Sequence, residues 1–255
     1  MRWQWNRVWL VLLVVLAIGV GCAQKNAQMK KMQRADAYYK MGIFYLENEN
    51  YKEAISQFRK ALDVDPTDPS FHFSLGTAYS LDGQDGPAID SLKRALHFDP
   101  KNSEAHNNLG YIYAKGGRWP EAIAEFKAAL ANPDYRRSYS AHLNLAQAYI
   151  QLGNIDSAKE EYRRALEVKP DSEVAHAGLG RAYQLSGQTE KAIEEWEKAL
   201  KINERQTGLY LDLAKAYSNK GDKEKAIAAL KKLIESDPRS PLAEEAKKQL
   251  QDLEK

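Results

Sequence analysis

Residues 173–206, EVAHAGLGRAYQLSGQTEKAIEEWEKALKINERQ, and residues 69–102, PSFHFSLGTAYSLDGQDGPAIDSLKRALHFDPKN, share one pattern of side chains over 34 positions. Each stretch has Leu-Gly at positions 7 and 8, Tyr at position 11 and Ala at position 20. Apolar residues spaced three and four apart, interrupted by a Gly-containing turn, indicate two amphipathic helices in each stretch. The fold therefore depends on how many such repeats the chain contains.

Six repeats are present. Tyrosine occupies position 11 and alanine position 20 in all of them, and position 24 always carries a large side chain. Large and small residues at fixed places let neighbouring helices interdigitate. Proline at position 32 of four repeats removes an N–H group and ends the second helix. The repeats begin at Ala35, Pro69, Ser103, Tyr139, Glu173 and Thr207.

Over residues 35–240 these positions resemble the tetratricopeptide-repeat family. The resemblance implies an all-α, right-handed superhelical solenoid of about thirteen helices with almost no strand. Residues 241–255 are expected to form an amphipathic capping helix with its leucines and an alanine facing inward. The expected repeats are 35–68, 69–102, 103–136, 139–172, 173–206 and 207–240, and the inward residues of the cap are Leu242, Ala246, Leu250 and Leu253.

Two departures from the repeat pattern stand out. Glu204 occupies the position of the terminal proline in the fifth repeat, which leaves room for a longer second helix. The third repeat ends in Asn-Pro-Asp-Tyr at residues 132–135 and is followed by two extra residues before Tyr139. We expect the pitch of the solenoid to change there.

The N-terminal segment has the order of a secretory signal peptide. Arg2 and Arg7 precede an apolar run over residues 8–18, and small residues lead from it to Cys22. A membrane-spanning helix needs about 20 apolar residues, which is more than this run supplies. Residues 1–21 are therefore predicted to be a cleaved signal peptide.

Cys22 is the single cysteine of the chain, and a free thiol is unfavourable in an oxidising compartment. Residues 18–22, Ile-Gly-Val-Gly-Cys, resemble the lipobox of bacterial lipoproteins, which implies that Cys22 carries a diacylglyceryl group. In that family Asp after the cysteine marks retention in the inner membrane, whereas Ala23 and Gln24 follow here. The resemblance implies an outer-membrane protein that faces the periplasm. No cofactor other than this covalent lipid is expected.

Residues 22–34 contain Lys25, Lys30, Lys31 and Arg34 and no acidic side chain. They are interpreted as a lipidated basic tether beside the membrane, with a solvated extension of the first helix as the alternative.

The overall composition argues against disorder and against nucleic-acid binding. With 44% hydrophobic and 28% charged residues, the chain can bury a core. Loss of the two signal-peptide arginines from 37 Lys and Arg would leave 35, which equals the 35 Asp and Glu. Such a balance gives no electrostatic reason to bind nucleic acid.

No short motif with a catalytic mechanism occurs in the sequence, so we expect no enzymatic activity and no small-molecule substrate. The repeat places histidine at position 4 four times, and there the family pattern has tryptophan. Packing residues are therefore predicted, not metal ligands. These histidines are His72, His106, His142 and His176.

In the family, the first helices of the repeats line a concave groove that binds peptides or partner helices through positions 2, 5, 9 and 12. The resemblance implies such a groove here, aromatic at one end and polar to basic at the other. The predicted groove residues are Tyr39, Phe73, Asn107, Tyr111, Gln147, Arg181, Gln184 and Lys215.

A lipoprotein with six such repeats resembles the lipoproteins required for type IV pilus biogenesis, which help the secretin oligomerise in the outer membrane. The resemblance implies a protein-interaction scaffold whose partners include secretin or other pilus-assembly proteins. Three alternatives stay open: an adapter that recruits peptidoglycan hydrolases or another envelope complex, a structural spacer and, more remotely, an enzyme.

Overall fold

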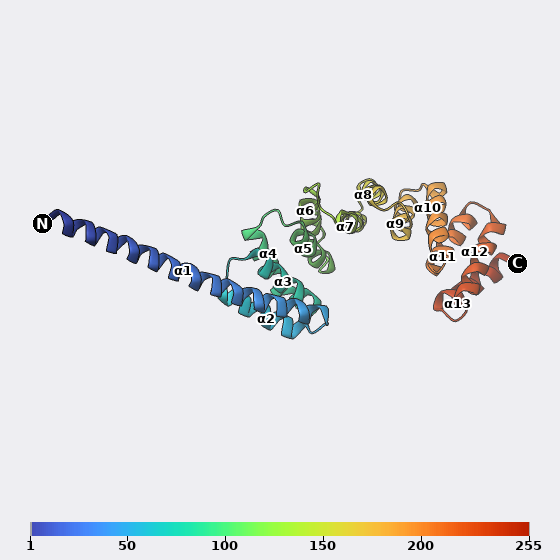
Figure 1. The fold of residues 1–255 in the computed structure, drawn as a ribbon. Coiled ribbons are helices and arrows are strands. Elements are labelled where there is room, and N and C mark those ends of the chain that lie inside the picture. Colours follow the sequence, from blue (N-terminus) through green and yellow to red (C-terminus); the bar gives the residue numbers. More distant parts are fainter. Residues whose placement is uncertain (1, 255) are drawn as a thin grey trace. The chain divides into compact units, whose positions relative to one another are not determined.

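The computed structural model describes the backbone of residues 2–254 and the side chains of residues 25–254. Over the described residues the chain forms thirteen α-helices and no strand (Figure 1). The predicted all-α repeat fold is confirmed. Cys22 and the predicted signal peptide lie outside the residues whose side chains are described. Among the residues whose side chains are described, no helix is long and apolar enough to cross a membrane.

The helices fall into two compact units, residues 1–112 and residues 113–255, called here the N-terminal and C-terminal units. In the N-terminal unit α1 packs along α2, α2 against α3, and α3 along α4. Its helices are α1 (Arg2–Glu47), α2 (Tyr51–Val64), α3 (Pro69–Leu81), α4 (Asp85–Phe98) and most of α5 (Ser103–Lys115).

In the C-terminal unit each helix packs against the next along the chain from α6 to α13, and α13 also contacts α11. Each first helix of a repeat thus lies between two second helices, which buries its apolar face. The helices are α6 (Trp119–Leu130), α7 (Ser138–Gln151), α8 (Ile155–Val168), α9 (Glu173–Leu185), α10 (Thr189–Ile202), α11 (Thr207–Asn219), α12 (Lys223–Ser236) and α13 (Pro241–Glu254).

Small residues set the distance between paired helices. The alanine at position 20 of every repeat is completely buried, as are Phe58 and Phe126 at position 24. A Cβ atom placed on Gly42 would lie 2.5 Å from the Phe58 ring, and one on Gly76 would lie 2.8 Å from Leu92. Both distances are well below the roughly 3.5 to 4.0 Å of favourable carbon contacts. The approach of the second helix thus requires glycine at position 8 in these two repeats, whereas the fourth and sixth repeats have alanine there.

The turn within each repeat uses a left-handed residue at position 15. In five repeats this residue is a glycine with φ between 71° and 77°, as at Gly187. Glycine adopts that conformation without steric cost. In the first repeat Glu49 takes the same place with φ 59°.

The two departures from the repeat pattern have local explanations. α10 ends at Ile202 although no proline follows, so the room left by Glu204 is not used. The side chain of Asn203 ends the helix by accepting the N–H of Arg205. After α6, Tyr135 turns inward and is buried with alanines of α6 and α7, so this residue of the irregular segment is part of the core. The two added residues are not buried: Arg137 is exposed and Ser138 is half-buried.

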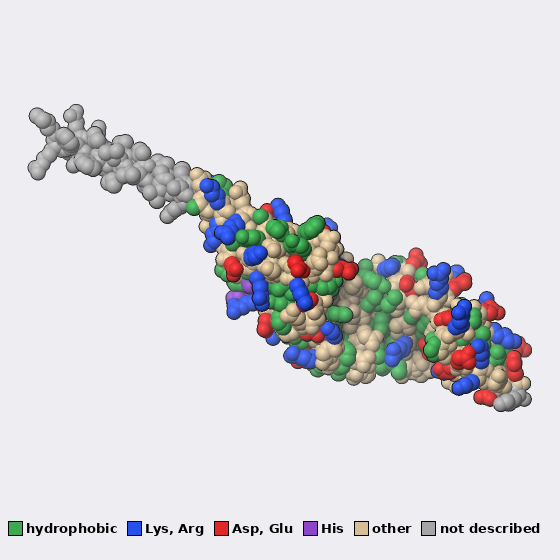
Figure 2. Space-filling model, turned by 90° about the horizontal axis from the view of Figure 1, so that it is seen from below, with side chains coloured by type: hydrophobic (Ala, Val, Ile, Leu, Met, Phe, Trp, Pro, Cys, Tyr) green, Lys and Arg blue, Asp and Glu red, His purple; other side chains and the backbone are tan. Residues whose placement is uncertain are grey.

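The capping helix α13 buries Ala243 and Ala246 completely, and its leucines pack against the core of α11 and α12. Its remaining side chains are mostly charged or amide groups that face water. On the face of the molecule in Figure 2, Lys and Arg side chains are interspersed with Asp and Glu side chains. Over the repeats the two signs of charge are thus mixed on this face, whereas residues 25–34 carry four cations and no acidic side chain.

Candidate functional site

The repeated histidines form hydrogen bonds at fixed places in the repeat. Nδ1 of His142 lies 2.6 Å from Glu161 Oε2, and Nδ1 of His176 lies 2.6 Å from Glu195 Oε2. In both pairs the side chains are largely buried, with 10 to 14% of their surface exposed. The glutamate stands at position 23, on the second helix of the same repeat.

The other ring nitrogen reaches the preceding repeat. Nε2 of His72, His106 and His176 lies 2.9, 3.2 and 3.1 Å from the carbonyl oxygen of the proline that ends that repeat. Both ring nitrogens of His176 therefore face acceptors, one on its own repeat and one on the preceding repeat. His142 makes only the glutamate contact within the described residues.

His72, His106 and His176 are therefore inter-repeat bridges, and His142 joins the two helices of its own repeat. Both roles are more than the packing role predicted for these side chains. The recurrence of Glu at position 23 together with His at position 4 was visible in the sequence and could have indicated the pairing. Among the described side chains, no group of three or more His, Cys, Asp and Glu residues is placed to hold a metal ion.

The predicted groove residues of the N-terminal unit come from α1, α3 and α5. Tyr39 is half-buried, its ring centre lies 5.0 Å from that of Phe71, and its oxygen accepts a hydrogen bond from Ser74 at 3.3 Å. Phe73 and Asn107 are also half-buried, and the side-chain oxygen of Asn107 is buried without a donor. Tyr111 is 55% exposed. Of these four, Tyr111 has the most accessible side chain.

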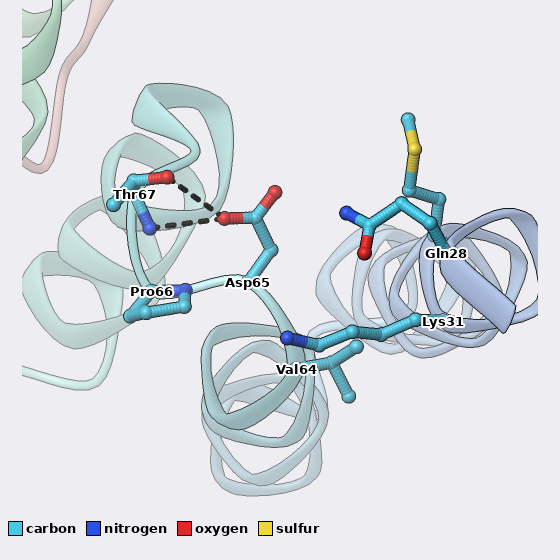
Figure 3. Close-up of a pocket in the computed structure, with 7 residues that line it drawn as sticks. Gln28, Lys31, Val64, Asp65, Pro66 and Thr67 are labelled. Atoms are coloured by element: carbon cyan, nitrogen blue, oxygen red, sulfur yellow. Dashed lines mark hydrogen bonds between the residues drawn. The ribbon is translucent and has the colours of Figure 1, made fainter. Parts of the chain in front are cut away.

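Near these residues α1 and the α2–α3 loop enclose a small hollow of about 200 Å³. Figure 3 shows the side chains of Gln28 and Lys31 directed toward Asp65. Asp65 Oδ1 accepts hydrogen bonds from the N–H and hydroxyl of Thr67 at 3.1 and 2.9 Å, which stabilises the loop. The hollow is smaller than pockets that enclose small ligands, which measure about 300 to 1,000 Å³.

In the C-terminal unit the predicted residues are joined by a side chain that the sequence analysis missed. The Tyr162 hydroxyl on α8 donates to Gln147 Oε1 on α7 at 3.4 Å. Its ring passes over Gly178 of α9, where an added Cβ would lie 2.4 Å from two ring carbons. Tyrosine at position 24 with glycine at position 6 occurs in this pair of repeats alone.

Arg181 lies beside two groups whose pKa values it influences. Burial raises the pKa of the Tyr162 hydroxyl, and the positive charge of Arg181 opposes that rise. Desolvation likewise raises the pKa of Asp212 on α11, against the charges of Lys215 and Arg181. Lys215 in turn pairs with Glu245 of α13 at 3.2 Å.

The carboxamide oxygen of Gln184, on the same helix as Arg181, is buried without a donor. The first helices of the C-terminal unit thus present hydrogen-bonding and charged groups in a row from α7 to α13. No predicted groove residue of this unit belongs to the hydrophobic core cluster. This arrangement is suited to binding a polar chain.

An array of helical hairpins with such a surface defines the class of helical-repeat interaction proteins. Four tetratricopeptide-repeat family models match residues 44–83, 87–136, 139–172 and 183–250. The chain belongs to the tetratricopeptide-repeat family. No curated protein sequence matches it.

Several solved structures resemble the chain. PilF of Pseudomonas aeruginosa is 20% identical, with a TM-score of 0.73 over 86% of this chain and 99% of that one. PilW, described as a widely conserved type IV pilus biogenesis factor, is 24% identical, with a TM-score of 0.71 over 83% and 97%. YrrB, described as a tetratricopeptide-repeat protein with an unusual peptide-binding site, is 21% identical, with a TM-score of 0.65 over 75% and 97%. At these identities the similarity establishes the fold.

Proposed function

We propose that this protein is a lipid-anchored scaffold that faces the periplasm and assists type IV pilus and secretin assembly in the outer membrane without catalysing a reaction. The observation that supports it best is the extent of the structural match. The repeat array corresponds to 99% of the PilF chain and 97% of the PilW chain, so it matches those proteins in extent as well as in repeat type.

The described surface supports binding as the activity. Extended or helical segments of a partner can lie along the first helices, where Tyr111 in the N-terminal unit and Arg181 in the C-terminal unit are exposed. Aromatic and arginine side chains contribute disproportionately to protein interfaces. Histidine is suited to proton transfer near neutral pH, but His142 and His176 are engaged by buried carboxylates.

Attachment to the membrane is assigned to the predicted lipid on Cys22. A single acyl chain anchors a protein only marginally, whereas two chains give stable attachment. A diacylglyceryl cysteine supplies both. The four cations of residues 25–34 would add about 1 kcal/mol each near an anionic surface.

The test is deletion of the gene in the source bacterium, followed by complementation. We expect fewer secretin multimers on immunoblots and fewer surface pili, with both restored by the parent protein. Complementation with Arg181→Glu/Tyr111→Ala should fail, whereas Arg164→Glu on the second helix of the fourth repeat should succeed. Normal multimers and pili in the deletion strain would refute the pilus role. Mislocalised peptidoglycan hydrolases in that strain would instead favour the adapter alternative.

A further inference from the structure

We propose that Arg181 anchors an acidic side chain, Asp or Glu, of a peptide that lies along the first helices of the C-terminal unit. The proposal rests on the proposed function, because it names the chemistry that the scaffold recognises there. Specificity for the acidic residue is thereby assigned to one guanidinium group.

Arg181 is a cation without a partner among the described residues. Its side chain is exposed on α9 and makes no hydrogen bond or ion pair there. Neighbouring cations of the same unit are neutralised: Lys215 by Glu245 at 3.2 Å, and Lys220 by Glu190 at 2.9 Å. A peptide carboxylate that approaches this row therefore meets at Arg181 a positive charge that no ion pair engages.

The polar groups beside Arg181 are held in fixed positions. The Tyr162 ring is 5% exposed and lies against the backbone of α9 at Gly178, so its hydroxyl group cannot swing away. Burial raises the pKa of that hydroxyl, which keeps it protonated and able to donate to Gln147. Asp212 is close enough to feel the Arg181 charge but forms no ion pair with it, so the guanidinium group stays available.

Gln184 provides a second point of recognition. It follows Arg181 by three residues on α9, and side chains at that spacing are neighbours about 5 to 6 Å apart. Its carboxamide oxygen has no donor, and a buried acceptor without a donor is unfavourable. Rotation of the carboxamide would let this oxygen accept the backbone N–H of a bound peptide. An acidic residue within a peptide offers both the carboxylate and the N–H, whereas an inorganic anion offers only the first.

The test uses the full-length protein, purified in detergent and immobilised, with two pools of nonapeptides. Both pools are random except at the central residue, which is Glu in one and Gln in the other. Retained peptide is quantified by mass spectrometry. Because charge-assisted Arg–carboxylate bonds are about twice as strong as neutral ones, we expect the parent to retain roughly five to ten times more of the Glu pool.

The variants separate the possible outcomes, with circular dichroism used to verify that each one is folded. Arg181→Gln should retain both pools equally, Arg181→Lys should keep part of the preference, and Gln184→Leu should reduce both pools alike. Arg164→Gln is the control, because Arg164 on α8 already pairs with Glu160 and Glu161. An unchanged preference in Arg181→Gln would overturn the assignment while peptide binding stands. If the parent retains neither pool, peptide binding itself fails, and the assignment fails with it.

Discussion

Replacing Gly178 by alanine should destabilise the C-terminal unit, although alanine is normally the better residue in a helix. The new Cβ would lie 2.4 Å from Cε1 and Cζ of Tyr162 and 2.8 Å from its oxygen. The ring cannot withdraw freely because it is part of the core that includes Ala146 and Leu179. Overpacking costs about 1 to 3 kcal/mol, and the Gly-to-Ala exchange in a helix returns about 0.5 to 1 kcal/mol. We expect a net loss of up to about 2.5 kcal/mol.

Gly208→Ala is the matched control. Gly208 lies on α11, the first helix of the next repeat, and a Cβ there would have no neighbour within 4 Å. This variant should gain up to about 1 kcal/mol. Urea denaturation followed by circular dichroism measures both changes as shifts in midpoint at constant slope.

A double variant distinguishes crowding from other causes. Tyr162→Leu puts at position 24 the residue that the second and sixth repeats have there, and it removes the atoms that the new Cβ would meet. Gly178→Ala should then cost much less in the Tyr162→Leu background than in the parent, which is the coupling expected of residues in contact. If Gly178→Ala stabilises the parent as much as Gly208→Ala does, the close approach of the Tyr162 ring is refuted.

Four further predictions follow from individual residues. Glu49→Gly should raise the free energy of unfolding by up to about 1 kcal/mol. The left-handed conformation costs a non-glycine residue about 1 to 2 kcal/mol, and the greater backbone entropy of glycine in the unfolded chain offsets part of that gain. A lower melting temperature would contradict this. His176→Phe should lower the free energy of unfolding by about 2 to 4 kcal/mol, because it removes two hydrogen bonds. His142→Phe removes a single hydrogen bond and should cost less. Equal losses of stability in urea titrations would contradict the bridge. Burial and, to a smaller extent, a hydrogen bond to a glutamate raise the pKa of Tyr217 in the folded protein. The contribution of Tyr217 to stability is therefore complete below the unfolded pKa of about 10 and declines as the pH rises above that value. Melting temperatures measured at increasing alkaline pH should fall more steeply for the parent than for Tyr217→Phe. Cys22→Ser should leave the protein soluble or unprocessed, and sedimentation of this variant with outer membranes at parental levels, or absence of labelled fatty acid on the parent, would exclude the lipid anchor.

The repeat architecture was predictable because each requirement recurs. A helix pair that approaches closely needs a small residue at positions 8 and 20. Because the pair occurs six times in the chain, the same requirement appears six times in one sequence. Gly42 and Gly76 illustrate this, since the side chain that each accommodates lies at the same position of the following helix.

The polar row of the C-terminal unit was only partly predictable. The spacing placed Gln147 and Arg181 on first helices, but not the Tyr162 hydroxyl, which reaches this row from a second helix across a glycine. Whether a charged side chain has a partner depends on the lengths and rotamers of its neighbours, which repeat positions do not specify. The left-handed conformation of Glu49 was not predictable either. The sequence shows that the first repeat has no glycine at position 15, but not that the turn keeps its shape without one.

The histidine bridges divide the array into groups of repeats that are coupled to different degrees. His72 and His106 link the first three repeats in series, and His176 links the fourth to the fifth. At the third-to-fourth junction His142 lacks the proline carbonyl, and the sixth repeat has Tyr210 in place of the histidine. In a linear array, cooperativity of unfolding is set by nearest-neighbour coupling. Amide exchange should therefore proceed in blocks whose limits fall at these two junctions without a histidine bridge, so that part of the array can open while the rest remains folded and able to hold a partner.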